Sequence, residues 1–93
     1  MSTKAERRAA RETVAAYHEE QLGQLVQHLA NAIDGYRAGN LDAFDVDQVA
    51  FQYSRAAKEL WKFCNLTHID IAARVIAEEA PTGWWERGAP RQR

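Results

Sequence analysis

The sequence predicts an all-α fold, an antiparallel helical hairpin with a long first helix, a second helix and a short third helix, followed by a tail that contains tryptophan. Residues 3–38 hold no proline and consist mainly of strong helix formers. Apolar residues recur at steps of three and four in three successive segments. No segment shows the period of two that half-buried strands require. The 93 residues are expected to form a single helical domain.

The first helix is expected over residues 3–38, with Gly39 as its C-terminal cap. Its second half has the cleanest apolar stripe, which comprises Leu22, Leu25, Val26, Leu29, Ala32, Ile33 and Tyr36. Residues 1–14 are rich in cations and are interpreted as a basic N-terminal extension that frays.

The second helix is expected to begin at Asp45, because its carboxylate can accept from free amides of the next turn and Gln48 completes a capping box. The apolar stripe of this helix has the spacing of a helix laid antiparallel along another and comprises Val46, Val49, Tyr53, Ala56, Leu60 and Phe63. Phe51 and Trp61 lie outside it. Such a second aromatic face either contacts a third element or binds another chain, and we assign these two residues to partner binding.

The third helix is expected to follow a capping box of Thr67 with Asp70 and to end at Pro81. Residues 81–93 are interpreted as a tail. Its adjacent Trp84 and Trp85 either fold back over the hairpin or dock in an apolar pocket of a partner or a second copy. Neighbouring side chains cannot both point the same way, so at least one indole should stay partly exposed or reach another chain. Arg87 adds a cation to this candidate anchor, as do Arg91 and Arg93.

The composition is that of an ordinary folded chain, with 46% apolar residues, 27% charged residues and a formal net charge of -1. These values favour neither global disorder nor bulk affinity for nucleic acid. Cys64 is the single cysteine, which excludes an internal disulfide and argues for a reducing compartment. No apolar run is long enough for a membrane span. We therefore expect a cytoplasmic protein that does not enter a membrane.

The residues that could perform chemistry are few. Cys64 and His68 have no second pair of ligands at a suitable spacing, so no metal and no cofactor are expected. Ser54 and Cys64 lack the glycine elbow of a catalytic nucleophile. Arg11 and His18 have the spacing found in small helical HEPN-type ribonucleases, in which such a pair handles a phosphodiester. A minimal ribonuclease using these two residues is therefore one alternative, although Glu12 is a poor neighbour for phosphate.

A basic cluster occupies one face of the first helical turns and comprises Lys4, Arg7, Arg8 and Arg11. It could contact phosphates, and a nucleic-acid-binding or structural helical homodimer is the second alternative. Cations at a helix N-terminus oppose the macrodipole, which favours a solvated helix start instead.

The segment YHEEQLGQLVQHLANAIDGYRAGNLDAFDVDQVAFQYSRAAKELWKFC, residues 17–64, joins a helix, an acidic turn and a second helix. It resembles the short antitoxins of bacterial toxin-antitoxin modules that accompany nucleotidyltransferase-fold toxins acting on tRNA. The resemblance implies a protein without catalysis that neutralises an enzyme by covering its active site. The expected partner is then a nucleotidyltransferase-like toxin, with a homo-oligomer as the other form of association.

Overall fold

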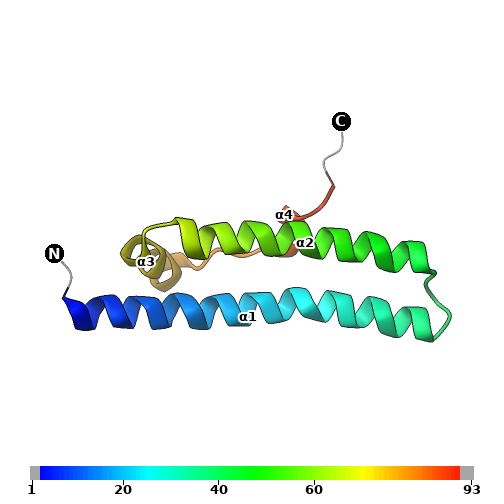
Figure 1. The fold of residues 1–93 in the computed structure, drawn as a ribbon, viewed down its shortest axis with the longest axis horizontal. Coiled ribbons are helices and arrows are strands. Elements are labelled where there is room, and N and C mark those ends of the chain that lie inside the picture. The colour runs from blue at the N-terminus through cyan, green and yellow to red at the C-terminus, as the bar shows by residue number, and fades with distance from the viewer. Residues whose placement is uncertain (1–2, 91–93) are drawn as a thin grey trace.

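The computed structural model describes residues 3–90, and within them the chain forms four helices and no strand. The long helices α1 and α2 run antiparallel and side by side (Figure 1). Helix α3 lies across the open end of this hairpin, and the short α4 lies behind α2 in the same view (Figure 1). The helices are α1 Lys4–Arg37, α2 Ala43–Leu66, α3 Ile69–Glu79 and α4 Trp84–Arg87. The all-α hairpin with a short third helix is confirmed.

Helix α1 is one continuous helix, and its N-terminal third belongs to the fold. The Thr3 hydroxyl accepts from the backbone N–H of Glu6 at 3.1 Å, which satisfies one of the free amides of the first turn. Ala10 and Val14 are only 8% and 5% exposed, and Val14 joins the core together with Ala72 of α3. The expectation that residues 1–14 fray is therefore wrong for residues 4–14, because α3 packs against this part of the helix. Residues 1 and 2 lie outside the described chain.

The hairpin turn follows the predicted chemistry with one shift. Gly39 has a left-handed φ of +81° just after the last turn of α1, as a C-terminal glycine should. The Asp42 carboxylate accepts from the N–H of Asp45 at 2.9 Å, and the Asp45 carboxylate accepts from the N–H of Asp42 at 3.0 Å. The N-cap of α2 is thus Asp42, and not Asp45 with Gln48. A second aspartate at the third helical position closes the reciprocal pair that a glutamate or glutamine usually closes.

The junction between α2 and α3 also differs from its expected form. Helix α2 continues to Leu66, and Thr67 is its C-terminal cap. The N-cap of α3 is His68, whose ring Nδ1 accepts from the N–H of Asp70 at 3.3 Å. A capping box of Thr67 with Asp70 is therefore not formed. Pro81 stops the helix as predicted, since α3 ends at Glu79.

The core is narrow and uses only part of the apolar stripes. Ala56, Leu60 and Ala72 have no exposed surface. In α1, by contrast, Val26 and Tyr36 of the predicted stripe remain 45% and 52% exposed. Two antiparallel helices bury only the side chains on the line where they meet, so the flanks of the stripe stay at the surface unless a third element covers them. The full core cluster comprises Val14, Tyr17, Leu25, Ala56, Leu60, Cys64, Ala72 and Trp84.

None of the helices within residues 3–90 combines the length and hydropathy needed to cross a membrane.

Candidate protein-binding surfaces

The segment after α3 folds back and inserts Trp84 into the core. Gly83 has a left-handed φ of +74°, which glycine adopts without strain and which turns the chain into α4. The indole Nε1 of Trp84 donates to the hydroxyl oxygen of Tyr17 at 2.7 Å, and that hydroxyl donates to the carbonyl oxygen of Pro81 at 2.5 Å. Trp84 is only 5% exposed. The expectation that it anchors a partner is corrected, because a buried indole with a satisfied N–H is already a core side chain of its own chain.

Tyr17 is the polar centre of this packing. Its side chain is buried, and burial raises the pKa of the Tyr17 phenol above its ordinary value of 10.0, while the hydrogen bond with Trp84 acts in the opposite direction. The neutral hydroxyl both accepts and donates, so it leaves no unpaired polar group in the core. The network holds the tail on α1 and requires the protonated phenol.

Trp85 and Arg87 stay at the surface of the docked tail. The Trp85 ring is half-buried and stacks on the imidazole of His28 in α1, with centroids 3.9 Å apart and planes inclined by 4°. The Arg87 guanidinium carbon lies 4.3 Å from the ring centroid of Trp84, and the residue is exposed. The expectation that one indole remains partly exposed therefore applies to Trp85. Its contact with His28 follows from helical phase, because His28 is three residues after the buried Leu25.

Two side chains of α2 fix the backbone of the tail. Gln52 Nε2 donates to the carbonyl oxygen of Trp85 at 2.9 Å, and Arg55 Nε donates to the carbonyl oxygen of Gly88 at 2.6 Å. Gly88 lies so close to α2 that a Cβ atom there would be 2.6 Å from the backbone nitrogen of Ala56. Only glycine permits this approach without a shift of one backbone. Residues 84–90 are thus part of the folded domain and not a free extension.

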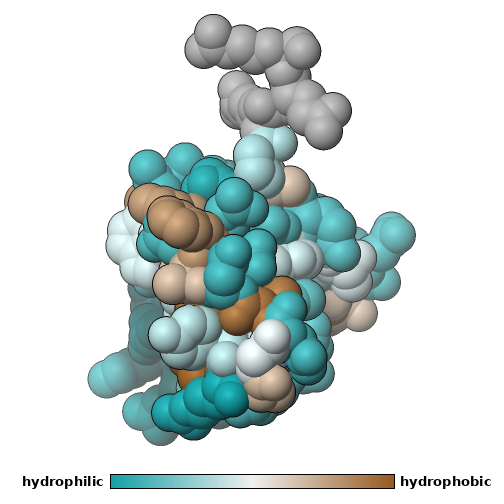
Figure 2. Space-filling view, turned by 90° about the vertical axis from the view of Figure 1, so that its right-hand side faces the viewer, coloured by the Kyte–Doolittle hydropathy of each residue, from teal (hydrophilic) through white to brown (hydrophobic). Residues whose placement is uncertain are grey.

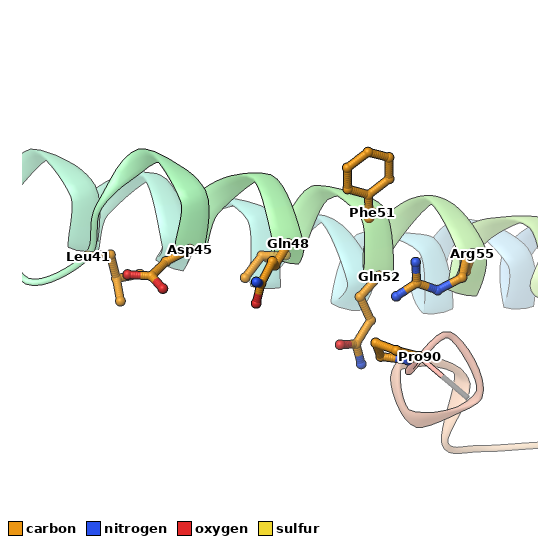
Figure 3. A pocket seen from close by; sticks show the side chains of 8 residues that line it. Leu41, Asp45, Gln48, Phe51, Gln52, Arg55 and Pro90 are labelled. Carbon is orange, nitrogen blue, oxygen red and sulfur yellow. The ribbon is translucent and has the colours of Figure 1, made fainter. Parts of the chain in front are cut away.

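A groove of about 620 Å³ runs along α2 beside the docked tail (Figure 3). Three of its four polar side chains already have partners: Gln52 and Arg55 donate to the tail, and Asp45 caps α2. Phe51 projects away from the tail in this view (Figure 3). A small-molecule site needs polar groups that converge on a ligand, and three of the polar groups here are committed to the fold. The lining consists of Leu41, Asp45, Gln48, Val49, Phe51, Gln52, Arg55 and Pro90.

Phe51 and Trp61 lie exposed on the outer side of α2, outside its apolar stripe. Phe51 is 59% and Trp61 is 50% exposed. Phe44, in the first turn of the same helix, is 79% exposed. It was not singled out from the sequence, although it is seven residues before Phe51 and therefore shares its face. Within residues 3–90, neither α1 nor the tail buries these aromatic rings.

A second apolar area lies between α1 and α2 near the turn. Ile33 and Tyr36 of α1 are 40% and 52% exposed, and with Ala43 and Val46 of α2 they line a small groove of about 130 Å³. Figure 2, which looks at the turn end of the hairpin, shows hydrophobic side chains reaching the surface among hydrophilic ones. Scattered apolar side chains are normal, but a contiguous group is typical of a binding surface.

The predicted basic cluster lies on the exposed side of the first turns of α1, and its four side chains, Lys4, Arg7, Arg8 and Arg11, are all exposed. Among residues 3–90 none of the four forms an ion pair. His18 is half-buried two turns after Arg11, and the two side chains share a face of the helix. Neither of them lines a groove described above. The structure thus places Arg11 and His18 on one face of α1, outside the grooves described above.

Cys64 is a core residue. Its thiol is buried, and burial raises the pKa of Cys64 above its ordinary value of 9.0. Such a thiol is a poor nucleophile at neutral pH, because the reactive form is the thiolate. Within the described chain no group of three or more histidine, cysteine or acidic side chains could hold a metal ion.

No protein-family model, curated protein sequence or solved structure matches this chain.

Proposed function

We propose that this chain is a protein-binding module of the antitoxin type, which neutralises a toxin enzyme by binding to it directly. The toxin would be nucleotidyltransferase-like and act in the cytoplasm. The observation that carries the proposal is the distribution of apolar surface. Among residues 3–90, eight large hydrophobic side chains are 40–79% exposed, namely Val26, Ile33, Tyr36, Phe44, Phe51, Trp61, Leu66 and Ile71.

The exposed set is large relative to the core. The side chains larger than alanine or cysteine that are fully in the core are Val14, Tyr17, Leu25, Leu60 and Trp84. Apolar surface that remains in water stabilises nothing in the isolated chain, whereas covering it contributes about 25 cal/mol per Å². A partner that binds the folded form also raises its stability by mass action. Both effects favour a chain that works in a complex, and a marginal free form is easily degraded.

The test is neutralisation by co-expression. Each gene adjacent to that of this chain is expressed alone in a heterologous bacterium, and growth is followed. We expect one neighbour to arrest growth, the chain to relieve the arrest, and the two proteins to co-purify as a complex of defined stoichiometry. Relief of the growth arrest and co-purification are compared for two variants of α1. Ile33→Asp places a charge in the apolar groove near the turn, and Gln24→Asp places the same charge on an exposed polar site of the same helix. The absence of any neighbour whose toxicity the chain relieves would refute the proposal.

A further inference from the structure

The outer face of α2 carries a regular seam that no part of the described chain covers. Its six positions follow one another at alternating steps of three and four residues, and all six are exposed. Steps of this kind keep side chains in line along one side of a helix. We refer to these residues as the outer seam: Phe44, Asp47, Phe51, Ser54, Lys58 and Trp61. The core-facing stripe of α2 lies on another side of the helix, and α4 contacts a third side through Gln52 and Arg55.

The outer seam is complementary to itself when two copies run antiparallel. Suppose that a two-fold axis passes between Gln52 and Tyr53. A residue that comes before this point in one helix then faces the residue that comes the same number of positions after it in the other helix. Phe44 then faces Trp61, and Asp47 faces Lys58 of the second copy. Both pairs occur twice because of the symmetry.

The two charged residues of the outer seam have no ion-pair partner among residues 3–90, where the one ion pair joins Lys62 to Glu59. In the antiparallel arrangement Asp47 and Lys58 neutralise each other. A parallel arrangement would instead place each residue beside its own copy, so that like charges and not opposite charges would meet. The order of charge along the seam therefore selects one orientation.

The side of the outer seam that borders α1 is suited to close approach. Three alanines, Ala43, Ala50 and Ala57, follow there at steps of seven residues, and small side chains let two helix axes come nearer. Ala43 also lines the groove near the turn, and Ala57 is partly buried against the core. Phe44 and Trp61 at the two ends supply the large rings, and such exposed aromatic residues are typical anchors of an interface.

We propose that this chain forms a two-fold symmetric homodimer in which the outer seams of two α2 helices pack antiparallel, with Phe44 on Trp61 and Asp47 on Lys58. Two hairpins joined in this way place the two α2 helices at the centre and the two α1 helices on the outside. The apolar groove near the turn is lined by Ile33, Tyr36, Ala43 and Val46, none of which is among the six residues of the outer seam. The dimer would cover Phe44, Phe51 and Trp61 of the exposed set and leave Ile33 and Tyr36 exposed. It therefore goes beyond the proposed function, and each can be tested without the other.

The test uses charge reversal measured by sedimentation equilibrium of the full chain. Asp47→Lys and Lys58→Asp each put like charges at both symmetric sites, and we expect dimerisation to weaken at least about tenfold in each variant. Mixing the two variants restores opposite charges at both sites, so the mixture should form a heterodimer although each variant alone does not. The double variant Asp47→Lys/Lys58→Asp should likewise recover the wild-type dissociation constant.

Asp34→Lys on α1 is the control for Asp47→Lys, since it changes the net charge by the same amount as that variant at an exposed site outside the outer seam. Circular dichroism of each variant checks that the helices are intact. A wild-type chain that is monomeric at about 100 µM overturns the proposal, and so does a dimer that is insensitive to both reversals or a mixture that does not recover association. Failure of this test with toxin neutralisation intact removes the dimer alone, and intact dimerisation without neutralisation removes the proposed function alone.

Discussion

Replacing Trp84 with alanine tests whether the tail is part of the folded domain. The side chain is 5% exposed and belongs to the core cluster, and truncation of such a residue costs roughly 3–5 kcal/mol of folding stability. Its indole also donates to Tyr17 at 2.7 Å, and loss of a hydrogen bond adds about 1 kcal/mol. A chain of this length is expected to have roughly 5–14 kcal/mol in all. The substitution should therefore remove a large part of the stability.

Trp85→Ala is the matched comparison, because the two tryptophans are adjacent and of equal size. Trp85 is half-buried and its ring contact is the stack on His28, so its truncation should cost only about 1 kcal/mol. The measurement is urea unfolding of both variants and the wild type, followed by far-UV circular dichroism, with the free energy of unfolding extrapolated to water. We expect a difference of at least about 2 kcal/mol between the variants.

The opposite ranking, or a cost below about 1 kcal/mol for Trp84→Ala, would refute the packing described here. In that case the tail would be detached in solution, and Trp84 would again be a candidate anchor for a partner, as the sequence allows. Partner binding measured on the folded fraction of both variants separates the two roles, since a core residue changes folding and leaves the affinity of the folded chain unaltered.

Two further predictions concern the attachment of the tail. Tyr17→Phe removes the acceptor of Trp84 and the donor to Pro81 and should cost about 1–3 kcal/mol at neutral pH. The pKa of Tyr17 is raised in the folded chain, so above pH 10 the folded wild type binds more protons than the unfolded wild type does. Its free energy of unfolding should therefore fall as the pH rises beyond that value. An equally steep fall in Tyr17→Phe would show that Tyr17 is not the cause. Gly88→Ala forces a Cβ to within 2.6 Å of the Ala56 nitrogen. This substitution should lower the free energy of unfolding by about 1–3 kcal/mol and shift the tryptophan fluorescence to the red. Gly23→Ala, at a helix position with open space, is the control and should be neutral or stabilising. A Gly88→Ala variant as stable as the wild type would contradict the close contact between tail and α2.

The sequence predicted those parts of the molecule that depend on local physics. The long first helix follows from residue propensities, and the antiparallel packing of α2 follows from the phase of Ala56 and Leu60, which are fully buried. The same phase argument predicted that Phe51 and Trp61 would lie outside the hairpin stripe, and the structure shows that no third element buries them within residues 3–90. Cap positions were less certain, because aspartates at 42 and 45 can both cap a helix, and the choice between them depends on which pair closes the reciprocal hydrogen bonds.

The place of the tail could be decided only by the tertiary structure. Trp84 finds its hydrogen-bond partner in Tyr17, which is 67 residues away in the chain, and Gly88 packs on Ala56 through a contact between backbones. No local pattern encodes either contact, since both depend on the space that α1, α2 and α3 leave between them. The sequence by itself determined that two adjacent tryptophans could not both be buried on one side. Which of them entered the core was fixed by the turn at Gly83 and by the buried Tyr17 hydroxyl, which accepts from the indole N–H of Trp84.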